Sequence, residues 1–436
     1  MDDNIIVSRY TFLFRKEGLN FIFNSRTNSF YNINDETFDF LNQIKGGGEI
    51  PENADECFLS QLKDKKILTT PEDETSYLDC LKLSYLSQAF SSSILALTIV
   101  PTVSCNLSCP YCFEQTKPGG IMDSGTMDKV VEFIKRRAVS KKYSINWFGG
   151  EPLIGLPVIS SLLNSLKKER EYEMVTHSIV TNGTLLNDDA ISLFQEFPLD
   201  NMQVTFDGFR DSHNSKRFFK SGEGTFDLIL NKLSNFVEKC PGTNVDLRVN
   251  IDNTNREDYL RMHELVKERF NGCRVYMYPG ILRANKGCED ETFFSSSDHL
   301  EFSRMLWKHR LQEMYPRQCN KGCCATSVSQ YVIGPRGELY VCWEHVGKDD
   351  RIIGYIDGRP GSATDRYSVY KLKGHCFEDK KCLGCGLLPL CTGGCPDKRI
   401  SNLLDDTGHN LCCVYGENGG EGLEDALFEY YKSGIK

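Results

Sequence analysis

The stretch ILALTIVPTVSCNLSCPYC, residues 94–112, joins an apolar run to three closely spaced cysteines. Its first part, residues 94–100, is aliphatic apart from one threonine, which is typical of a buried strand. The loop that follows carries Cys105, Cys109 and Cys112 in the spacing C-x3-C-x2-C. Three thiols this close indicate a metal site, a redox pair or chance, and a tetrahedral metal would still lack a fourth ligand.

The same succession of apolar strand and helix recurs along residues 94–282. Helical patterns separate the strands, for example at residues 124–142 and 157–172. The six predicted strands cover residues 94–100, 144–150, 176–183, 202–208, 244–251 and 274–280. Alternating strands and helices predict an α/β fold with a parallel sheet covered by helices. Six units favour a partial (β/α)6 barrel over a closed eightfold barrel.

Polar and glycine-rich motifs follow the second, third and fourth of these strands. The motifs are Gly149-Gly150-Glu151-Pro152, Thr181-Asn182-Gly183 and Thr205-Phe206-Asp207-Gly208. The carboxyl ends of barrel strands meet at one face, where active sites lie. We therefore expect these motifs and the cysteine loop to form one site. The alternative is that they are ordinary turns at strand ends.

Residues 1–75 are expected to form a small separate unit. Short aromatic-rich segments separated by turn residues predict a three-stranded meander, at residues 9–15, 19–25 and 29–34. A helical pattern follows, with Asn34 or Asp35 as its N-cap and glycines at its end. A second helical pattern covers residues 54–66. Three strands followed by two or three helices predict a winged-helix-like unit.

The composition is that of a soluble globular protein, because 40% of the 436 residues are hydrophobic and 25% are charged. This length fits two or three domains. The N-terminus is acidic and lacks the apolar core of a signal peptide, and no long apolar run occurs. We therefore expect a cytoplasmic protein that does not insert into a membrane. The net charge of -9 argues against a nucleic-acid partner.

Nineteen cysteines are an unusually large number for such a protein. A reducing cytosol disfavours disulfides, so this abundance indicates metal or cluster ligation. Apart from Cys376, ten of them lie at short spacings between Cys319 and Cys413. We interpret six others as small hydrophobic or incidental thiols, namely Cys57, Cys80, Cys240, Cys273, Cys288 and Cys376.

The C-terminal cysteines follow a regular spacing. Cys324 is followed by twelve residues, Gly337, four residues and Cys342. The spacing C-x2-C-x5-C-x3-C comes later, at Cys382, Cys385, Cys391 and Cys395. Cys412 and Cys413 complete the series. Thiolates are the usual ligands of iron-sulfur clusters and a common choice for zinc, so the spacing predicts one of these two kinds of site.

The cysteine loop and the strand-end motifs resemble those of the radical S-adenosylmethionine superfamily. The resemblance implies a 4Fe-4S cluster held by Cys105, Cys109 and Cys112, whose free iron binds the methionyl amine and carboxylate. One electron would then cleave the sulfonium to methionine and a 5′-deoxyadenosyl radical. The resemblance also implies a set of residues that bind S-adenosylmethionine, namely Gly149, Gly150, Glu151, Thr181, Asn182, Thr205, Asp207 and Arg217.

The C-terminal spacing resembles that of SPASM domains, which carry two auxiliary 4Fe-4S clusters and would bring the total to three. The resemblance assigns Cys324, Cys342 and Cys395 to the first, with Cys319 or Cys323 as a fourth ligand. Whether that cluster keeps an open iron is left undecided. To the second it assigns Cys382, Cys385, Cys391 and either Cys412 or Cys413. Cys413 is favoured because an aromatic residue, Tyr415, stands two positions on.

The order of these parts resembles that of maturases of ribosomally made peptides. The expected segments are a peptide recognition element, a partial barrel, a linking helix and a SPASM domain, at residues 1–75, 76–283, 284–318 and 319–436. The leader of a precursor peptide would add to the N-terminal sheet as a strand. A flavodoxin or ferredoxin would donate electrons. Removal of residues 1–70 would then leave the clusters and uncoupled cofactor cleavage intact.

The implied reaction is a thioether or carbon-carbon crosslink in the peptide, formed after hydrogen abstraction by the radical. No residue is identified as a general base. Two alternatives remain at this point. The first is an anaerobic sulfatase-maturing enzyme that forms formylglycine, which normally lacks the N-terminal segment. The second is a cluster-bearing electron carrier or peptide-binding protein without radical chemistry, against which the intact cysteine loop and the GGEP motif argue.

Replacing Cys105, Cys109 and Cys112 together by alanine is expected to remove one of three clusters, or about 4 of about 12 irons. Formation of 5′-deoxyadenosine is expected to stop, because the cofactor loses the iron that binds it. Anaerobic iron and sulfide analysis and liquid chromatography of the nucleoside products measure both results. A triple variant that still cleaves S-adenosylmethionine would place the site elsewhere.

Overall fold

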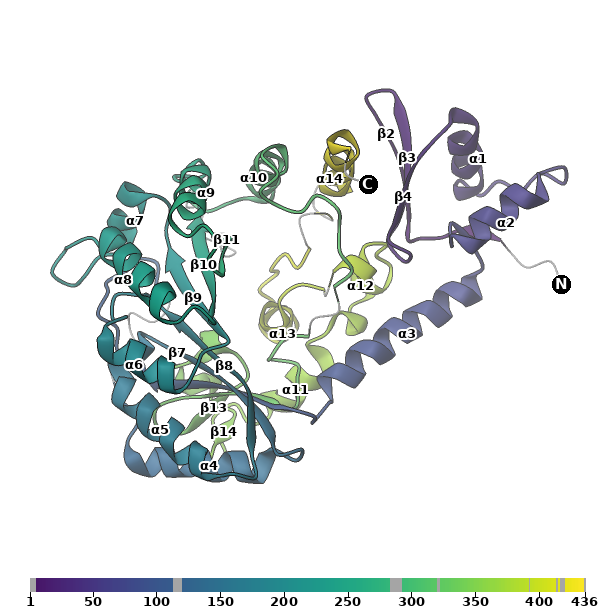
Figure 1. Cartoon of the computed structure of the whole chain (residues 1–436). Helices are drawn as coiled ribbons and strands as arrows, with labels where there is room; N and C mark the ends of the chain where they lie inside the picture. The colour runs from purple at the N-terminus through teal and green to yellow at the C-terminus, as the bar shows by residue number, and fades with distance from the viewer. Residues whose placement is uncertain are drawn as a thin grey trace. The chain divides into compact units, whose positions relative to one another are not determined.

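The computed structural model describes residues 5–112, 120–282, 292–319, 322–391, 393–412, 415 and 420–434. The chain divides into two compact units, drawn in Figure 1. The first unit comprises Met1–Ala89, Ser295–Cys323 and Leu372–Lys436, and the second comprises Phe90–Phe294 and Cys324–Lys371. Within the described residues, no helix is both long and apolar enough to cross a bilayer.

Six parallel strands in chain order form most of the sheet of the second unit, which confirms the predicted fold class. The first strand is buried almost throughout, as expected where both faces of a parallel sheet are covered. Each strand ends at the same edge, which brings the sequence motifs together. The strands are β6 (Leu95–Thr102), β7 (Lys142–Gly149), β8 (Glu173–Thr181), β9 (Asn201–Phe206), β10 (Asn244–Ile251) and β11 (Val275–Ile281).

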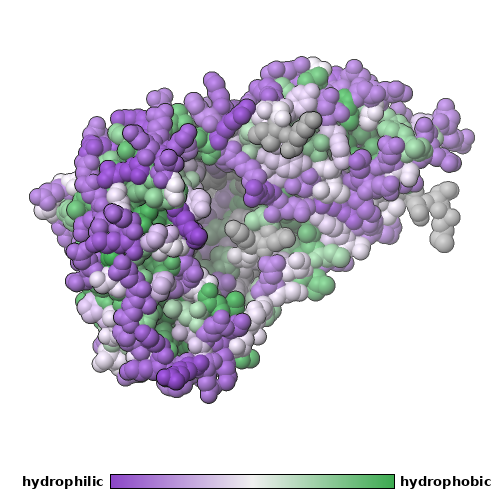
Figure 2. All heavy atoms as spheres, viewed as in Figure 1, coloured by the Kyte–Doolittle hydropathy of each residue, from purple (hydrophilic) through white to green (hydrophobic). Residues whose placement is uncertain are grey.

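Helices connect these strands and lie along one side of the sheet (Figure 1). Their apolar residues recur every three or four positions; in α8, for example, Ile229, Leu233 and Phe236 are fully buried. Hydrophilic residues cover most of the face seen in Figure 2. The helices are α4 (Ser124–Arg137), α5 (Leu156–Lys168), α6 (Asp188–Glu196), α7 (Arg210–Lys216), α8 (Phe226–Lys239) and α9 (Asp258–Arg269), with a short 3-10 turn at Pro152–Gly155.

Three further strands extend the sheet beyond β6, namely β12 (Gln330–Ile333), β13 (Glu338–Tyr340) and β14 (Gly354–Tyr355). The strand β12 pairs in parallel with β6, and β13 pairs with β12 across a turn at Gly337, whose φ of +79° suits glycine. These strands were not predicted from the sequence, because they are too short to show alternating apolar and polar residues. They place the segment between Cys324 and Cys342 in the same unit as the six parallel strands.

The N-terminal segment forms the predicted antiparallel meander, in the order β2-β3-β4. Asn34 is the N-cap of the first helix and accepts a hydrogen bond from the Thr37 N–H, as one of the two proposed caps. The likeness to a winged helix stays a prediction. The elements are β1 (Ile6–Val7), β2 (Thr11–Lys16), β3 (Leu19–Asn24), β4 (Ser29–Ile33), α1 (Asp35–Lys45), α2 (Glu56–Asp64), β5 (Leu68–Thr69) and α3 (Pro71–Ala89).

The central strand β3 is buried on both faces of this sheet. On one face Ile22 packs with side chains from α1 and α2. On the other, Phe21 and Phe23 share a core with residues from the C-terminal part of the chain, namely Leu387, Leu390, Leu423, Leu427 and Phe428. A side-chain hydrogen bond joins the same parts, because Arg9 Nη1 donates to the Leu383 carbonyl over 3.0 Å. The N-terminal segment is therefore part of the cysteine-rich unit.

This shared core contradicts the expectation that residues 1–70 could be removed without harm to the clusters. Deletion would expose the five apolar C-terminal side chains, and each fully buried side chain of this size contributes about 1.5–3 kcal/mol. A test of the N-terminal segment therefore needs point changes at its surface. The division into four functional segments, at residues 1–75, 76–283, 284–318 and 319–436, remains a prediction.

The remaining helices are α10 (Ser296–Lys308), α11 (Arg366–Lys373), α12 (Lys380–Leu383), α13 (Pro396–Asp405) and α14 (Glu421–Ser433). The linking helix, expected within residues 284–318, covers Ser296–Lys308 and ends there because Arg310 adopts a φ of 56°. The helices α10 and α14 are joined by Arg304, whose Nε donates to Asp425 over 2.5 Å.

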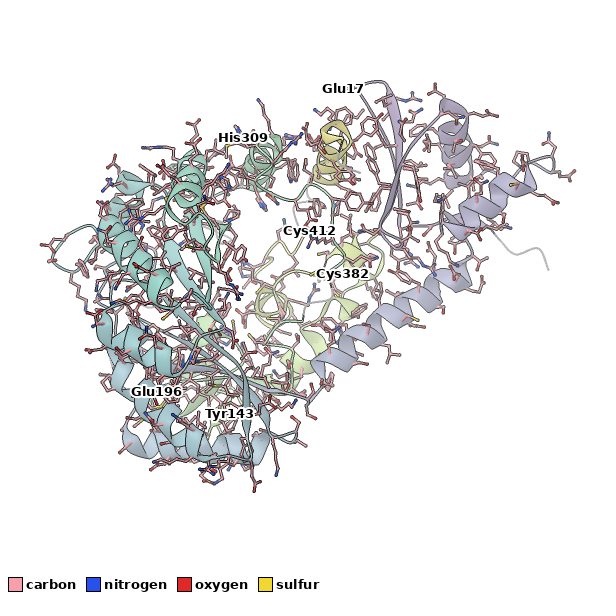
Figure 3. The ribbon with its side chains drawn as sticks, viewed as in Figure 1. Glu17, Tyr143, Glu196, His309, Cys382 and Cys412 are labelled. Atoms are coloured by element: carbon pink, nitrogen blue, oxygen red, sulfur yellow. The ribbon has the colours of Figure 1, made fainter. Side chains whose placement is uncertain are left out.

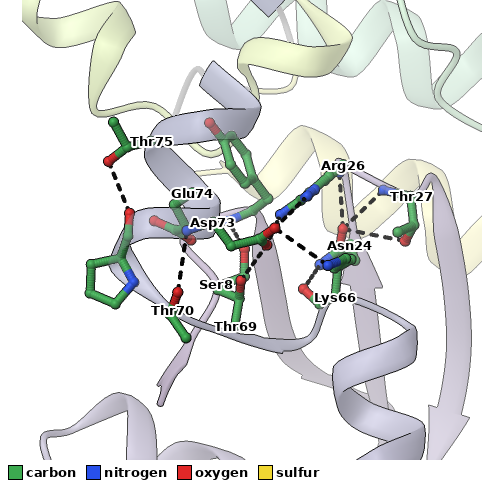
Figure 4. A network of polar contacts seen from close by, with 12 residues as sticks. Ser8, Asn24, Arg26, Thr27, Lys66, Thr69, Thr70, Asp73, Glu74 and Thr75 are labelled. Carbon is green, nitrogen blue, oxygen red and sulfur yellow. Dashed lines mark hydrogen bonds and ion pairs between the residues drawn. The ribbon is translucent and has the colours of Figure 1, made fainter. Parts of the chain in front are cut away.

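A polar network joins the N-terminal strands to α3 (Figure 4). Asp73 pairs with Arg26, accepts a 2.6 Å hydrogen bond from the Thr69 hydroxyl, and lies 3.4 Å from Lys66 Nζ. Hydrogen bonds from Arg26 and then Thr69 hold the pKa of Asp73 well below its usual range. The start of α3 is thereby fixed to the turn after β3.

Replacing Asp73 by asparagine is expected to destabilise the protein by about 1 kcal/mol at neutral pH, since the carboxylate is one-third exposed and partly screened. A depressed folded-state pKa contributes stability above the unfolded pKa of about 3.9 and loses it as the pH falls further. Thermal unfolding should therefore show a constant gap between wild type and variant down to about pH 4, narrowing below it. A gap that widens in acid would contradict the assignment.

Candidate functional site

The loop of Cys105, Cys109 and Cys112 follows β6 and is fixed on two sides. On one side, Ser108 N–H donates to the Phe218 carbonyl over 2.9 Å. On the other, the amide of Asn182, at the end of β8, donates to Asn106 Oδ1 over 2.9 Å and lies 3.9 Å from the Cys105 sulfur. The structure thus brings together the first and third sequence motifs.

The three thiols lie near one another in a desolvated environment. Burial raises the pKa of Cys109 to about 11, and the nearby Arg217 guanidinium opposes that rise. Cys105 and Cys112 interact with Cys109 electrostatically. The irons of a bound cluster would stabilise the thiolates and so lower the thiol pKa that burial raises.

No three His, Cys, Asp or Glu side chains in the described part of the chain are close enough to hold a single metal ion. A zinc ion needs its donors about 2.0–2.3 Å from one point. Each cysteine of a 4Fe-4S cube binds a different iron, so its ligands stand farther apart. The assignment of the cysteines as cluster ligands rests on their spacing and stays a prediction.

The glycines of the GGEP motif pack against the loop of the cysteines. A Cβ at Gly150 would lie 2.4 Å from the Ser104 carbonyl oxygen, and one at Gly149 would lie 2.3 Å from that of Thr102. Gly149 also has a φ of +133°, which only glycine adopts easily. Both glycines are therefore required for the strand ends to meet, whether or not their backbone also contacts a ligand.

Glu151 is fully buried, and protein donors surround its carboxylate. Oε1 accepts from the Thr181 hydroxyl at 2.7 Å and from Leu153 N–H at 3.1 Å, while Oε2 accepts from Asn182 N–H at 2.7 Å. Burial raises the pKa of Glu151, and these hydrogen bonds oppose the rise. Its side chain thus connects the ends of β7 and β8, whereas the sequence suggested contact with a methionyl ammonium, which remains a prediction.

A buried polar cluster lies at the ends of β9 and β10. The hydroxyl of Tyr111 donates to Asp207, and Arg217 Nη1 donates to the Tyr111 oxygen over 3.2 Å. Arg217 lies 3.5 Å from Asp207, and Asn250 lies 3.4 Å from Tyr111. Burial strongly affects this cluster and raises the pKa of Tyr111 beyond its ordinary value.

Two atoms of this cluster, Asp207 Oδ1 and Arg217 Nε, are buried and have no hydrogen-bond partner within the described residues. A buried unpaired acceptor and donor cost free energy, so such atoms commonly face a ligand. One carboxylate acceptor and one guanidinium donor match the ammonium and carboxylate of an amino acid. These residues fit the methionyl group of S-adenosylmethionine. Thr205, on the adjacent part of β9, is nearly buried.

The cysteines expected to hold the first auxiliary cluster are divided between the two units. Cys324 and Cys342 belong to the second unit, where the Cys324 carbonyl lies 3.4 Å from Lys371 Nζ. Cys319, Cys323 and Cys395 belong to the first unit. Within that unit, Cys323 is close enough to Cys395 to raise its thiol pKa, although burial raises it more.

The cysteines expected to hold the second auxiliary cluster all belong to the first unit, where Figure 3 labels Cys382 and Cys412. Burial raises the pKa of Cys385, and the nearby Cys391 and Cys412 raise it further. Cys382 interacts with Cys391 in the same way. Cys413, the favoured last ligand, lies outside the described residues, while the structure brings Cys412 near Cys385.

Three contacts near these sites were not predicted from the sequence, although Tyr111 matched the aromatic position just before the last cysteine of the loop. The Tyr111 hydroxyl joins the Asp207–Arg217 pair. Cys376, interpreted as a small hydrophobic or incidental thiol, is 2% exposed and packs with Phe377 and Leu388, and it also interacts with Cys382 and Cys391. Arg399 donates to the Cys382 sulfur over 3.5 Å. Their sequence signals are weak, since Cys376 stands six residues before Cys382 and Arg399 four residues after Cys395.

Comparison with known proteins shows which families the chain resembles. Residues 99–266 match the radical SAM superfamily. The cysteine-type anaerobic sulfatase-maturating enzyme of Clostridium novyi (strain NT) is 26% identical over 354 residues, which cover 73% of this chain and 92% of the relative. The radical SAM cyclopropyl synthase TigE of Paramaledivibacter caminithermalis (strain DSM 15212 / CIP 107654 / DViRD3) is 21% identical over 445 residues, covering 85% and 89%.

Among solved structures, native anSMEcpe with bound AdoMet and Cp18Cys peptide superposes with a TM-score of 0.61. The match covers 78% of this chain and 97% of the solved chain, at 19% sequence identity. It shows a shared fold. Residues 99–266 of this chain therefore form a radical SAM domain, and the chain is an enzyme.

Replacing Glu151 by glutamine is expected to destabilise the protein by about 1–3 kcal/mol, because an amide would oppose a donor where the carboxylate now accepts. The midpoint of thermal unfolding measures the loss. Glu196, an exposed glutamate on α6 that pairs with Lys167 and is labelled in Figure 3, provides the matched control. Equal midpoints for the Glu151→Gln and Glu196→Gln variants would refute the structural role of Glu151.

Proposed function

We propose that this chain, an enzyme with a radical SAM domain, installs a thioether or carbon-carbon crosslink in a ribosomally made precursor peptide. The observation that carries this proposal is the presence of two features in one chain. One is the cysteine loop with its adjacent buried carboxylate and guanidinium, and the other is a three-stranded N-terminal sheet with open edges. An enzyme that acts on a peptide needs both a reactive centre and a surface that holds the peptide.

The residues of the second unit have distinct roles in this proposal. Cys105, Cys109 and Cys112 hold a 4Fe-4S cluster, and Asp207 with Arg217 receives the amine and carboxylate of S-adenosylmethionine. When bound, the cluster and S-adenosylmethionine supply a 5′-deoxyadenosyl radical that removes a hydrogen atom from the peptide. Burial of the surrounding side chains limits reaction with water.

The N-terminal sheet provides a surface for the leader. The strand β4 has β3 as its only neighbour among the described residues, so one edge offers unpaired N–H and C=O groups. An extended peptide can add there through main-chain hydrogen bonds. Tyr31 lies on β4, and Lys65 Nζ donates to its hydroxyl over 2.9 Å and lies 4.5 Å from its ring. The edge therefore combines backbone groups, an aromatic ring and a positive charge.

The C-terminal cysteines would hold two auxiliary clusters, which accept the electron released when the new bond forms. Cys382, Cys385 and Cys391, with Cys412 or Cys413, would hold one, and Cys324, Cys342 and Cys395, with Cys319 or Cys323, the other. An external flavodoxin or ferredoxin would reduce the first cluster. This part rests on the spacing of the cysteines and on the electrostatic interactions among those of the first unit.

Formylglycine formation in a sulfatase is the second candidate function. The similarity to sulfatase-maturating enzymes over most of both chains supports it. The N-terminal sheet argues against it, because a sulfatase segment needs no dedicated leader-binding edge. Both candidates use the same cysteines and the same S-adenosylmethionine site, so only the product separates them.

The test is co-expression of the enzyme, under anaerobic conditions, with each small open reading frame beside its gene and, separately, with a sulfatase peptide that contains the target cysteine, followed by mass spectrometry of the peptides. A crosslink removes two hydrogen atoms and leaves no aldehyde. Formylglycine made from cysteine exchanges sulfur for oxygen with loss of two hydrogens, and its aldehyde reacts with hydroxylamine. A hydroxylamine-reactive sulfatase peptide, with no modified small peptide, would overturn the crosslinking proposal.

A photoreactive benzoylphenylalanine in place of Tyr31 is expected to crosslink to the precursor peptide found in that way, because strand addition brings the peptide against β4. The same residue in place of Glu17, at the β2–β3 turn of the same sheet, is the matched control. Gel shift and mass spectrometry detect the adduct. Equal labelling from both positions, or labelling only from position 17, would contradict a leader-binding edge at β4.

A further inference from the structure

Arg399, on α13, is a buried cation next to the cysteines of the first unit. Its side chain is 8% exposed. Burying a guanidinium costs free energy unless its N–H groups are hydrogen-bonded to acceptors. The acceptors around Arg399 therefore show what stabilises its charge.

The partners of Arg399 are a carboxylate, a carbonyl and a thiol. Nη1 donates to Asp379, which precedes α12 and also accepts from Lys381 N–H over 2.9 Å. Nη2 donates to the carbonyl of Gly393 and, over 3.5 Å, to the sulfur of Cys382. Arg399 therefore holds a positive charge against one cysteine of the proposed auxiliary cluster.

The position of Gly393 is fixed by the same packing. Its φ is +82°, and a Cβ there would lie 2.2 Å from the Cβ of Cys376. Gly393 N–H also donates to the sulfur of Cys391 over 3.3 Å. Two cysteine sulfurs of one proposed cluster thus receive N–H donors from neighbouring groups, and Arg399 holds the loop that supplies the second donor.

We propose that Arg399 is a positioning residue that stabilises the reduced state of the auxiliary cluster bound by Cys382 and thereby raises its reduction potential. Reduction adds negative charge to a cluster and its thiolates. A guanidinium hydrogen-bonded to a ligand sulfur stabilises that added charge, and hydrogen bonds to sulfur are among the factors that set cluster potentials. This inference rests on the proposed function, which places a cluster at Cys382.

A purely structural role would need no sulfur contact. Arg26 provides the comparison, because it forms a similarly buried pair with Asp73 in the same unit, with 13% of its side chain exposed. The Arg26 guanidinium donates to the Asp73 carboxylate and lies 4.4 Å from the centroid of the Tyr77 ring. Arg399 differs in directing one nitrogen at a cysteine sulfur.

The test is an anaerobic redox titration of the full-length reconstituted enzyme, followed by electron paramagnetic resonance. Wild type is compared with Arg399→Lys, Arg399→Met and the control Arg26→Lys. We expect the midpoint potential of one cluster to fall in the order wild type, Arg399→Lys, Arg399→Met. For Arg399→Met, the ratio of reduced to oxidised cluster at fixed potential should fall about tenfold, or about 59 mV for one electron. Arg26→Lys should leave every midpoint unchanged.

Iron and sulfide content separates the possible failures. A wild-type enzyme without auxiliary iron would refute the proposed function itself. Full iron content with unchanged midpoints in both Arg399 variants would overturn this inference alone. Loss of the cluster in both Arg399 variants would also overturn it, because Arg399 would then serve cluster assembly and not the potential. An equal shift of the midpoint potential in Arg26→Lys would overturn the inference, because the effect would then come from general destabilisation of the unit.

Discussion

One buried carboxylate holds together the strand ends on which the reactive site depends. Glu151 accepts hydrogen bonds from Thr181 and Asn182 at the end of β8, and its own N–H donates to the Ser104 carbonyl after β6 over 2.9 Å. Asn182 in turn contacts the loop of the cysteines. A carboxylate taken out of water is costly unless fully hydrogen-bonded, so the three strand ends and the cysteine loop have a single favourable arrangement.

A second constraint is the apolar core that the N-terminal sheet shares with the cysteine-rich C-terminal segment. The N-terminal sheet shares an apolar core with the segment that carries Cys385 and Cys391 and with α14. In the proposed function this makes the leader-binding edge and one auxiliary cluster parts of one compact unit. Changes in the N-terminal core would therefore alter cluster stability as well as peptide binding, and only surface changes on β4 separate the two.

The sequence predicted the regular parts of this fold well. The six strands from 94–100 to 274–280 and the meander at 9–34 correspond closely to β6–β11 and β2–β4, because apolar periodicity follows directly from burial. It missed β12–β14, which are too short to show a period and owe their existence to pairing with β6. It also overextended the linking helix, since the left-handed backbone at Arg310 leaves no pattern in composition.

The sequence named candidate site residues but not all of their contacts. The motifs named Gly149–Glu151 and Asp207, and the resemblance added Arg217. Spacing alone could not show that Glu151 would bind protein donors or that Tyr111 would join Asp207 to Arg217. Cys376 and Arg399 lie outside the repeated spacing, and only the packing around Gly393 brings them to the cysteines. Such contacts depend on tertiary structure, which local patterns do not encode.

The central claim is that this enzyme removes a hydrogen atom from a peptide. The most direct measurement supplies the precursor peptide fully deuterated at carbon, with S-adenosylmethionine of natural isotopic content, and determines the mass of the 5′-deoxyadenosine produced. The account predicts that 5′-deoxyadenosine gains one deuterium for each peptide modified. Modified peptide accompanied by 5′-deoxyadenosine without deuterium would contradict it.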